Sequence, residues 1–284
     1  MESEVLTFLD HSRERAGLRY VYPVLSRRAG GLSVGVNLNP NNACNWRCVY
    51  CQVPGLRRGA APRIDVERLE EELREFLRAV MAGDYLQRHL PPEFRVFRDV
   101  AVSGNGEPTT AREFAAVVEA IARVRQDLGV PANVKTVLIT NGTQVHRPHV
   151  RAGIEKLAVL SGEVWFKVDR VTPQGMRAVN GTRFPLARVQ ENLIACSELC
   201  STWIQSCWFA SDGAPPPNEE VDAFVAFLAN LLGLDAPVRG VLLYTLARPS
   251  AQPEANRLAP LPREWLEGMA ERVRAVGWPV RVYD

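Results

Sequence analysis

Three cysteines in one short loop are the residues of this chain best suited to chemistry. Cys44, Cys48 and Cys51 follow the spacing C-x3-C-x2-C. Iron–sulfur clusters and structural zinc sites ordinarily take four protein ligands. Three thiolates from one loop would leave one iron of a four-iron cluster without a protein ligand. Such an open position is what a metal site needs in order to bind and act on a substrate.

These cysteines have two other interpretations, a zinc site completed by a distant histidine and three ordinary thiols. Zinc sites usually show paired C-x2-C knuckles with a second pair downstream, whereas the downstream cysteines, at 196, 200 and 207, have a different layout. Three ordinary thiols within eight residues are hard to explain. A [4Fe–4S] cluster is therefore the favoured interpretation.

A glycine-rich turn, Ser103-Gly-Asn-Gly-Glu-Pro-Thr109, follows a predicted strand at 100–103. Glycine lets a backbone approach a ligand closely. The plain structural interpretation is a turn before a helix; the functional one is a cradle for a bound molecule.

The two motifs together resemble the radical S-adenosylmethionine (SAM) superfamily, with the aromatic Tyr50 before the last cysteine. Residues 25–28, 32–40 and 248–249 resemble a subgroup related to wyosine-tRNA synthesis, and similarity runs over most of residues 20–283. Wyosine-forming enzymes carry further cysteines near the N-terminus, but residues 1–43 contain none. This departure argues against wyosine synthesis.

The resemblance implies a [4Fe–4S] cluster and SAM as cofactors. In the superfamily, an electron from the reduced cluster splits the C5′–S bond of SAM, and the resulting 5′-deoxyadenosyl radical abstracts hydrogen from a substrate. It also implies an external electron donor resembling flavodoxin or ferredoxin. RNA is one candidate substrate, and a small molecule or a protein side chain are the alternatives.

The resemblance also assigns cofactor-binding roles. The backbone of Gly104, Asn105 and Gly106 would meet the amino group of SAM, and Glu107 would pair with that ammonium. Tyr50 is a further candidate for a cofactor contact. Other candidates lie on later strands: Lys167, Asp169, Gln205, Ser206 and the backbone of Leu243 and Tyr244.

Some of these residues have structural alternatives. Lys167 and Asp169 lie two apart on a predicted strand, so they point to the same face, where a salt bridge is the alternative to cofactor contact. Either Gln205 or Ser206 would reach the ribose. Thr140 and Asn141 line the pocket or cap a turn.

The second set of cysteines, Cys196, Cys200 and Cys207, invites a second cluster. Cys196, however, continues the apolar helical row of Leu186, Val189 and Leu193. Because cysteine is often fully buried, core or pocket lining is the favoured interpretation.

The elements that must position these residues alternate strictly. Strands are predicted at 32–38, 100–103, 136–140, 164–168, 202–209 and 240–246, with helices between them. Strands joined by helical crossovers predict a parallel sheet, here an α/β partial (β/α)6 TIM-like barrel. We predict a basic N-terminal arm over residues 1–30 and a single domain over 31–284.

Composition excludes several classes of protein. The 284 residues carry a net charge of +2, and 46% are hydrophobic, so disorder is not expected. Residues 1–63 hold nine arginines against four acidic residues. This excess of positive charge indicates either a solvated surface arm or an entrance that attracts an anionic substrate. No signal peptide or membrane span is visible, which predicts a cytoplasmic protein without membrane partners.

Two rival functions follow from the same cysteines. One is an iron–sulfur protein for electron transfer or sensing, which would have no need of the glycine-rich cradle. The other is a zinc-stabilised RNA-binding module, which would bind a colourless metal and ignore SAM.

Overall fold

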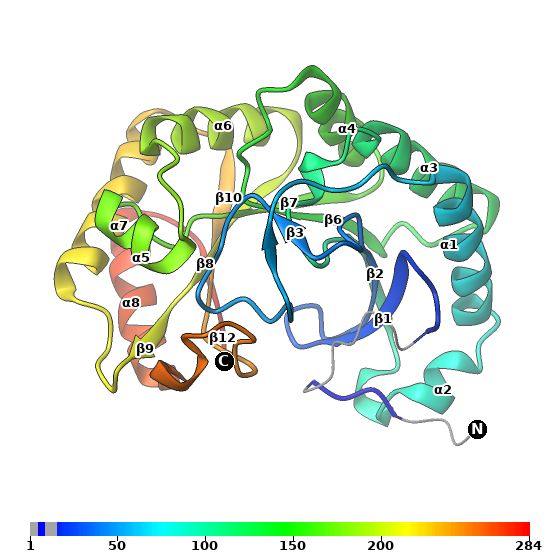
Figure 1. Ribbon diagram of the computed structural model, residues 1–284, viewed down its shortest axis with the longest axis horizontal. Helices are drawn as coiled ribbons and strands as arrows, with labels where there is room; N and C mark the ends of the chain where they lie inside the picture. The colour runs from blue at the N-terminus through cyan, green and yellow to red at the C-terminus, as the bar shows by residue number, and fades with distance from the viewer. Residues whose placement is uncertain (1–4, 9–15) are drawn as a thin grey trace.

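The computed structural model, which describes residues 5–8 and 16–284, is built on one curved sheet of eight strands (Figure 1). Helices cover the outer side of the curve, and the concave side faces the cysteine loop (Figure 1). The strands lie in the order β1 (Val21–Ser26), β2 (Gly31–Val36), β5 (Phe97–Val102), β6 (Lys135–Thr140), β7 (Gly162–Lys167), β8 (Thr202–Cys207), β10 (Val238–Tyr244) and β12 (Val280–Tyr283).

The predicted α/β partial barrel with parallel strands is confirmed. Neighbouring strands from β2 to β12 pair in parallel, and six of them are the predicted ones. The outer helices are α1 (Val66–Met81), α3 (Phe114–Asp127), α4 (Pro148–Ala158), α6 (Leu186–Leu199), α7 (Asn218–Gly233) and α8 (Arg263–Val276). The prediction lacked β12, α2 (Tyr85–His89) and α5 (Pro173–Asn180).

The first strand also differs from expectation. β1 pairs antiparallel with β2, from Val21 opposite Val36 to Ser26 opposite Gly31. The last third of the predicted arm therefore belongs to the sheet, because its apolar residues add an edge strand. The rest of the arm includes residues 1–4 and 9–15, which lie outside the described residues.

The core lies between the sheet and the helices. Alternate strand residues, such as Leu138, Val164 and Phe166, are fully buried in it against helix residues such as Phe114 and Ile121. The other strand residues point to the concave side, since side chains alternate along a strand. In the described part of the chain, no helix has both the length and the apolar character of a membrane span.

Two small ribbons complete the fold. β3 (Ala43–Cys44) pairs with β4 (Arg57–Arg58), and β9 (Phe209–Ser211) pairs with β11 (Leu258–Pro260). The first ribbon closes the cysteine loop on itself, so both ends of that loop are held in one place.

Candidate active site

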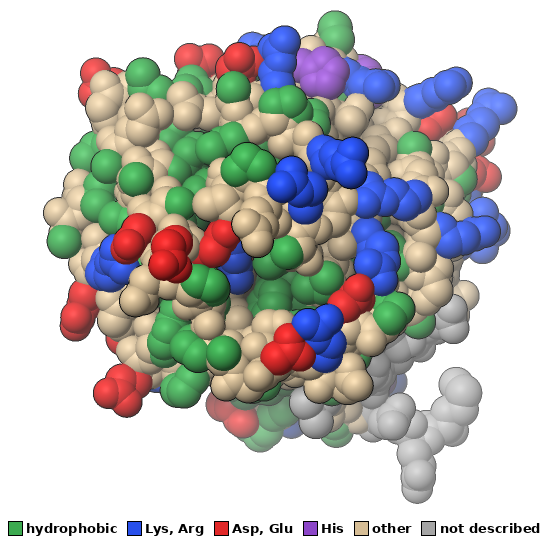
Figure 2. Space-filling model, turned by 60° about the vertical axis from the view of Figure 1, so that its left-hand side comes forward, with side chains coloured by type: hydrophobic (Ala, Val, Ile, Leu, Met, Phe, Trp, Pro, Cys, Tyr) green, Lys and Arg blue, Asp and Glu red, His purple; other side chains and the backbone are tan. Residues whose placement is uncertain are grey.

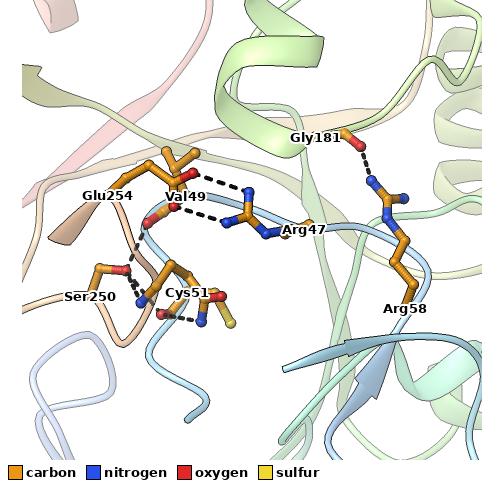
Figure 3. A network of polar contacts seen from close by, with 8 residues as sticks. Arg47, Val49, Cys51, Arg58, Gly181, Ser250 and Glu254 are labelled. Carbon is orange, nitrogen blue, oxygen red and sulfur yellow. Dashed lines mark hydrogen bonds and ion pairs between the residues drawn. The ribbon is translucent and has the colours of Figure 1, made fainter. Parts of the chain in front are cut away.

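The cysteine loop is anchored by segments that are distant in sequence (Figure 3). Arg47 donates to both carboxylate oxygens of Glu254, at 3.1 and 3.2 Å. Ser250 Oγ donates to the carbonyl oxygens of Val49 and Cys51, at 2.7 and 3.1 Å. Because these contacts fix the chain from Arg47, just before the second cysteine, to the third cysteine, they also fix where those two sulfurs point.

The three cysteines line a single cavity of about 290 Å³ on the concave side of the sheet. The glycine-rich turn contributes Gly104, Gly106 and Glu107 to the same cavity. Of the other predicted site residues, the cavity is lined by Tyr50, Asn141, Lys167, Gln205 and Tyr244. The structure thus brings together two motifs that lie more than fifty residues apart.

Burial disfavours the ionised form of the cysteines on their own. It raises the pKa of Cys44 to about 12 and that of Cys48 to about 11. Since a metal binds the thiolate, binding here would release protons. No group of His, Cys, Asp and Glu in the described residues converges as it would on a single metal ion. A four-iron cluster takes its thiolates on separate irons and needs no such convergence.

The glycine turn packs directly against the start of the cysteine loop. A Cβ on Gly106 would overlap the carbonyl oxygen of Ala43, the residue before Cys44. Gly104 has a φ of +151°, and a Cβ there would overlap the Asn37 side chain. Only glycine allows this approach, so the turn sets the distance between the two motifs.

Glu107 is buried beneath the turn and organises the neighbouring strand end. It accepts hydrogen bonds from the backbone nitrogen of Asn141 and from Thr140 Oγ1, both at 2.6 Å, and from Thr109. Burial raises the pKa of Glu107, while these hydrogen bonds oppose the rise. Asn105 does not line the cavity; its side-chain nitrogen donates to Asn42 at 2.6 Å.

Asp169 lies behind the cavity wall rather than in it. Its carboxylate accepts from the Tyr50 hydroxyl at 2.5 Å, from Asn180 Nδ2 at 2.6 Å and from the Cys207 nitrogen at 2.9 Å. The alternative of a salt bridge between Lys167 and Asp169 is not what the structure shows. Lys167 Nζ instead lies 4.8 Å from the centroid of the Tyr50 ring and faces the cavity.

Lys167 remains charged in this setting. Burial by itself lowers the pKa of Lys167, but the fields of Tyr244, Asp169 and Cys48 outweigh burial and raise it. The cavity wall next to the cysteines therefore carries a fixed positive charge.

The later strands present alternate residues to the cavity. Gln205 lines it, and its Nε2 is buried without a hydrogen-bond partner among the described residues. Ser206 points the other way, where its hydroxyl accepts from Trp208 Nε1 at 2.8 Å. Leu243 is buried in the core behind the sheet. The side chains of Ser206 and Leu243 therefore do not reach the cavity.

The unpaired donor Gln205 Nε2 indicates whether a polar cofactor would fit the cavity. An amide left unpaired in a buried position is costly, so a molecule that accepts from Gln205 Nε2 would relieve that cost. The three thiols, the glycine cradle and this donor are a set that fits an iron–sulfur cluster together with a polar cofactor.

Asn180 is a site residue that the sequence prediction did not include. It ends α5, and its side-chain nitrogen lies 3.4 Å from the sulfur of Cys48. Two local signals could have revealed this helix, since Thr172 caps its start and Gly181, with a φ of 60°, ends it.

The second set of cysteines does not form one site. Cys196 and Cys200 belong to the hydrophobic core on the helix side of the sheet, and Thr202 Oγ1 donates to Cys196 at 3.6 Å. Cys207 faces the cavity beside Tyr50. Cys196 and Cys200 therefore lie on the opposite face of the sheet from Cys207. The first two are core residues, and Cys207 lines the pocket.

Comparison with known proteins places this geometry in a family. The model of the radical SAM superfamily matches residues 38–172, which include both motifs. A protein of Synechocystis sp., UPF0026 protein slr1464, is 26% identical over 161 residues, which are 56% of this chain and 52% of that protein. The chain spans about half the length, or less, of the curated relatives it matches.

Solved structures share the fold at low identity. TYW1 with a lysine-pyruvate adduct bound has a TM-score of 0.57 at 16% identity, covering 86% of this chain and 73% of that one. A radical SAM methyltransferase from Sphaerobacter thermophilus has a TM-score of 0.59 at 14% identity, covering 93% and 68%. Residues 38–172 therefore match the radical SAM superfamily that the sequence predicts, and the solved structures show that the chain shares its fold.

Proposed function

We propose that this chain holds one [4Fe–4S] cluster through Cys44, Cys48 and Cys51 and cleaves SAM to start a radical reaction on a substrate. The observation that carries the proposal is the shared cavity, which both the cysteine loop and the glycine-rich turn line. An electron-transfer or sensing protein would have no use for that turn.

The bound cofactors would supply a 5′-deoxyadenosyl radical for hydrogen abstraction, and the protein supplies binding and orientation. Gly104 and Gly106 offer backbone groups at close range, while Gln205 offers an unpaired amide donor. Asn180 and the Tyr50–Asp169 pair hold the cysteine loop in place behind the cavity. Placing the site on the concave side of the sheet would limit the access of bulk water to a reactive intermediate.

An external donor resembling flavodoxin or ferredoxin would deliver the electron, because the described residues hold only one cysteine loop suited to a cluster. The substrate would enter from the solvent-facing side of the cavity. One face of the molecule has a hollow lined by hydrophobic side chains, with basic and acidic side chains around it (Figure 2). RNA, a small molecule and a protein side chain are the candidate substrates.

Anaerobic reconstitution with iron and sulfide tests the proposal. The full chain should become brown and hold about four irons, and with dithionite and SAM it should release 5′-deoxyadenosine. Cys48→Ala should lose both properties. Cys196→Ala is the matched control, because Cys196 lies in the core away from the cavity and should keep both.

Each rival has its own outcome in this experiment. A colourless protein that retains zinc supports the RNA-binding module. A brown protein that produces no more 5′-deoxyadenosine than Cys48→Ala supports electron transfer or sensing, and the proposed function then fails.

A further inference from the structure

We infer that the substrate carries an oxyanionic group, a carboxylate or a phosphate, and that Arg28 with its neighbour Arg27 binds it in the part of the cavity away from the cysteines. This inference rests on the proposed function and names the chemical class of its substrate. Both arginines directly follow β1, and both line the cavity that holds Cys44, Cys48 and Cys51.

Arg28 is held between two aromatic rings of the cavity wall. Its guanidinium carbon lies 5.2 Å from the centroid of the Trp165 ring and 5.0 Å from that of Tyr244. Trp165 is two residues before Lys167 on β7, so its side chain sits about 7 Å further along the strand, away from the cysteine end. Arg28 therefore occupies a different layer of the cavity from Lys167.

Neither arginine has an acceptor in the described part of the chain. No hydrogen bond or ion pair to a described residue satisfies the guanidinium of Arg27 or of Arg28, although each guanidinium carries five N–H donors. Burial lowers the pKa of Arg27, and the neighbouring charge of Arg28 adds to that effect, which the carboxylate of Asp284 partly opposes.

The buried arginines of the described residues, Arg125 and Arg170, both have acceptors. Arg125 donates to the carbonyl oxygen of Val134 at 2.7 Å, and Arg170 donates to those of Asp169 and Cys207 at 2.6 and 3.1 Å. Arg28, which is half-buried against two aromatic rings, thus has no acceptor among the described residues, and the exposed Arg27 lies next to it on the cavity lining.

The charges that line the cavity favour an anion at this place. Lys167 and Arg248 add to the positive charge, and Arg248 is itself held by the Gln52 side chain and the Phe8 carbonyl. The carboxylates that line the cavity are Glu107 and Asp99. Glu107 is occupied by donors of its own region, and Asp99 accepts from Ser33 Oγ at 2.5 Å.

The arrangement would hold a substrate by one end. A guanidinium fork matches the two oxygens of a carboxylate or phosphate, and stacking on Trp165 and Tyr244 limits its movement. The rest of the substrate would then extend toward the cysteine end of the cavity. Fixing the reacting carbon in this way is the positioning that an abstraction step requires.

Calorimetric titration of the cluster-reconstituted full chain tests the inference without any turnover. Inorganic phosphate and acetate are the two probes, since a phosphate-bearing and a carboxylate-bearing substrate predict different preferences between them. Arg28→Gln should weaken binding of the preferred probe by at least about 10-fold, the loss expected for hydrogen bonds to a charged group. Arg78→Gln, on the exposed face of α1, is the matched control and should bind as the wild type does.

Arg28→Lys distinguishes a loss of binding from a folding defect in Arg28→Gln. The lysine keeps the charge but lacks the fork, so it should bind several-fold more weakly while retaining the melting temperature and iron content of the wild type. The inference is overturned if the wild type binds neither probe, or if Arg28→Gln and Arg28→Lys bind as well as Arg78→Gln.

The proposed function fails separately. A wild-type protein that releases 5′-deoxyadenosine but binds neither probe keeps its function and loses this substrate class. One that binds a probe through Arg28 but releases no 5′-deoxyadenosine keeps the anion site and loses the radical reaction.

Discussion

The side-chain nitrogen of Asn180 lies 3.4 Å from the sulfur of Cys48, and the same amide group donates to Asp169 at 2.6 Å. The backbone oxygen of Asn180 also accepts from the Arg47 nitrogen at 3.1 Å. One residue at the end of α5 thus contacts the cysteine loop at its backbone and at a predicted cluster ligand. Residues in such a position orient the ligand and adjust the electronic properties of the metal.

Asn180→Ala should weaken cluster retention by about 10-fold, the usual effect of removing a partner of a metal ligand. It should also lower the reduction potential of the cluster, because a hydrogen bond to a ligating sulfur stabilises the more negative reduced state. Chelator challenge and a redox titration measure the two effects. Asn230→Ala, at an exposed amide that bonds Gln190, is the control, and equal behaviour of the two variants would contradict the assignment.

Gly106→Ala should impair assembly of the site. Its Cβ would overlap the carbonyl oxygen of Ala43, which is backbone and cannot move aside without shifting Cys44. We expect a clear drop in iron content after reconstitution, with a loss of stability of about 1–3 kcal/mol as for other overpacked positions.

Gly268→Ala is the control for that experiment. Gly268 lies inside α8, and a Cβ added there would meet open space, so alanine should stabilise the protein by about 0.5–1 kcal/mol and leave iron content unchanged. If both glycine variants load iron equally well, the close approach of the two motifs is not needed.

Tyr50→Phe should reduce the free energy of unfolding by about 1.5–3 kcal/mol, because it removes a buried hydrogen bond to the carboxylate of Asp169. Burial and the charge of Asp169 hold the pKa of Tyr50 well above its ordinary value, so the hydroxyl stays a donor over the accessible pH range. Urea unfolding measures the loss. Tyr283→Phe, at another cavity-lining tyrosine, removes no hydrogen bond to a described residue and should be neutral.

Asp99 gives the stability of the fold a specific pH dependence. Burial raises the pKa of Asp99 from 3.8 to about 6, although Ser33 and Arg28 oppose the rise. The folded state therefore binds more protons than the unfolded state in this window. The contribution of Asp99 to stability therefore falls as pH rises from about 4 to 6, by about 3 kcal/mol in total, and is level above that range.

Asp99→Asn should remove this dependence while keeping an acceptor for Ser33. Urea titrations measure the free energy of unfolding of both proteins at pH 4 and at pH 7.5. The difference, variant minus wild type, should be about 3 kcal/mol larger at pH 7.5 than at pH 4. Glu93→Gln, at an exposed carboxyl group, serves as the control. A wild-type–variant difference that is the same at both pH values would show that Asp99 is not buried as a carboxyl group.

Much of the fold is readable from local sequence. The apolar runs that become β2, β5, β6, β7, β8 and β10, and the helices between them, are local patterns, and their strict alternation restricts the topology to parallel crossovers. The edge strands β1 and β12 were not predicted, since their place depends on pairing partners rather than on their own pattern.

The cysteine spacing and the glycine-rich turn determined the kind of chemistry, because each motif is contiguous and its residues act together wherever the loop lies. Tertiary structure alone decided which residues accompany them. Alternation along a strand says that Gln205 and Ser206 face opposite sides, but only packing shows that Gln205 faces the cavity. The contacts of Cys48 with Asn180 and of Arg28 with Trp165 join residues more than 130 apart, and no local pattern encodes such a distance.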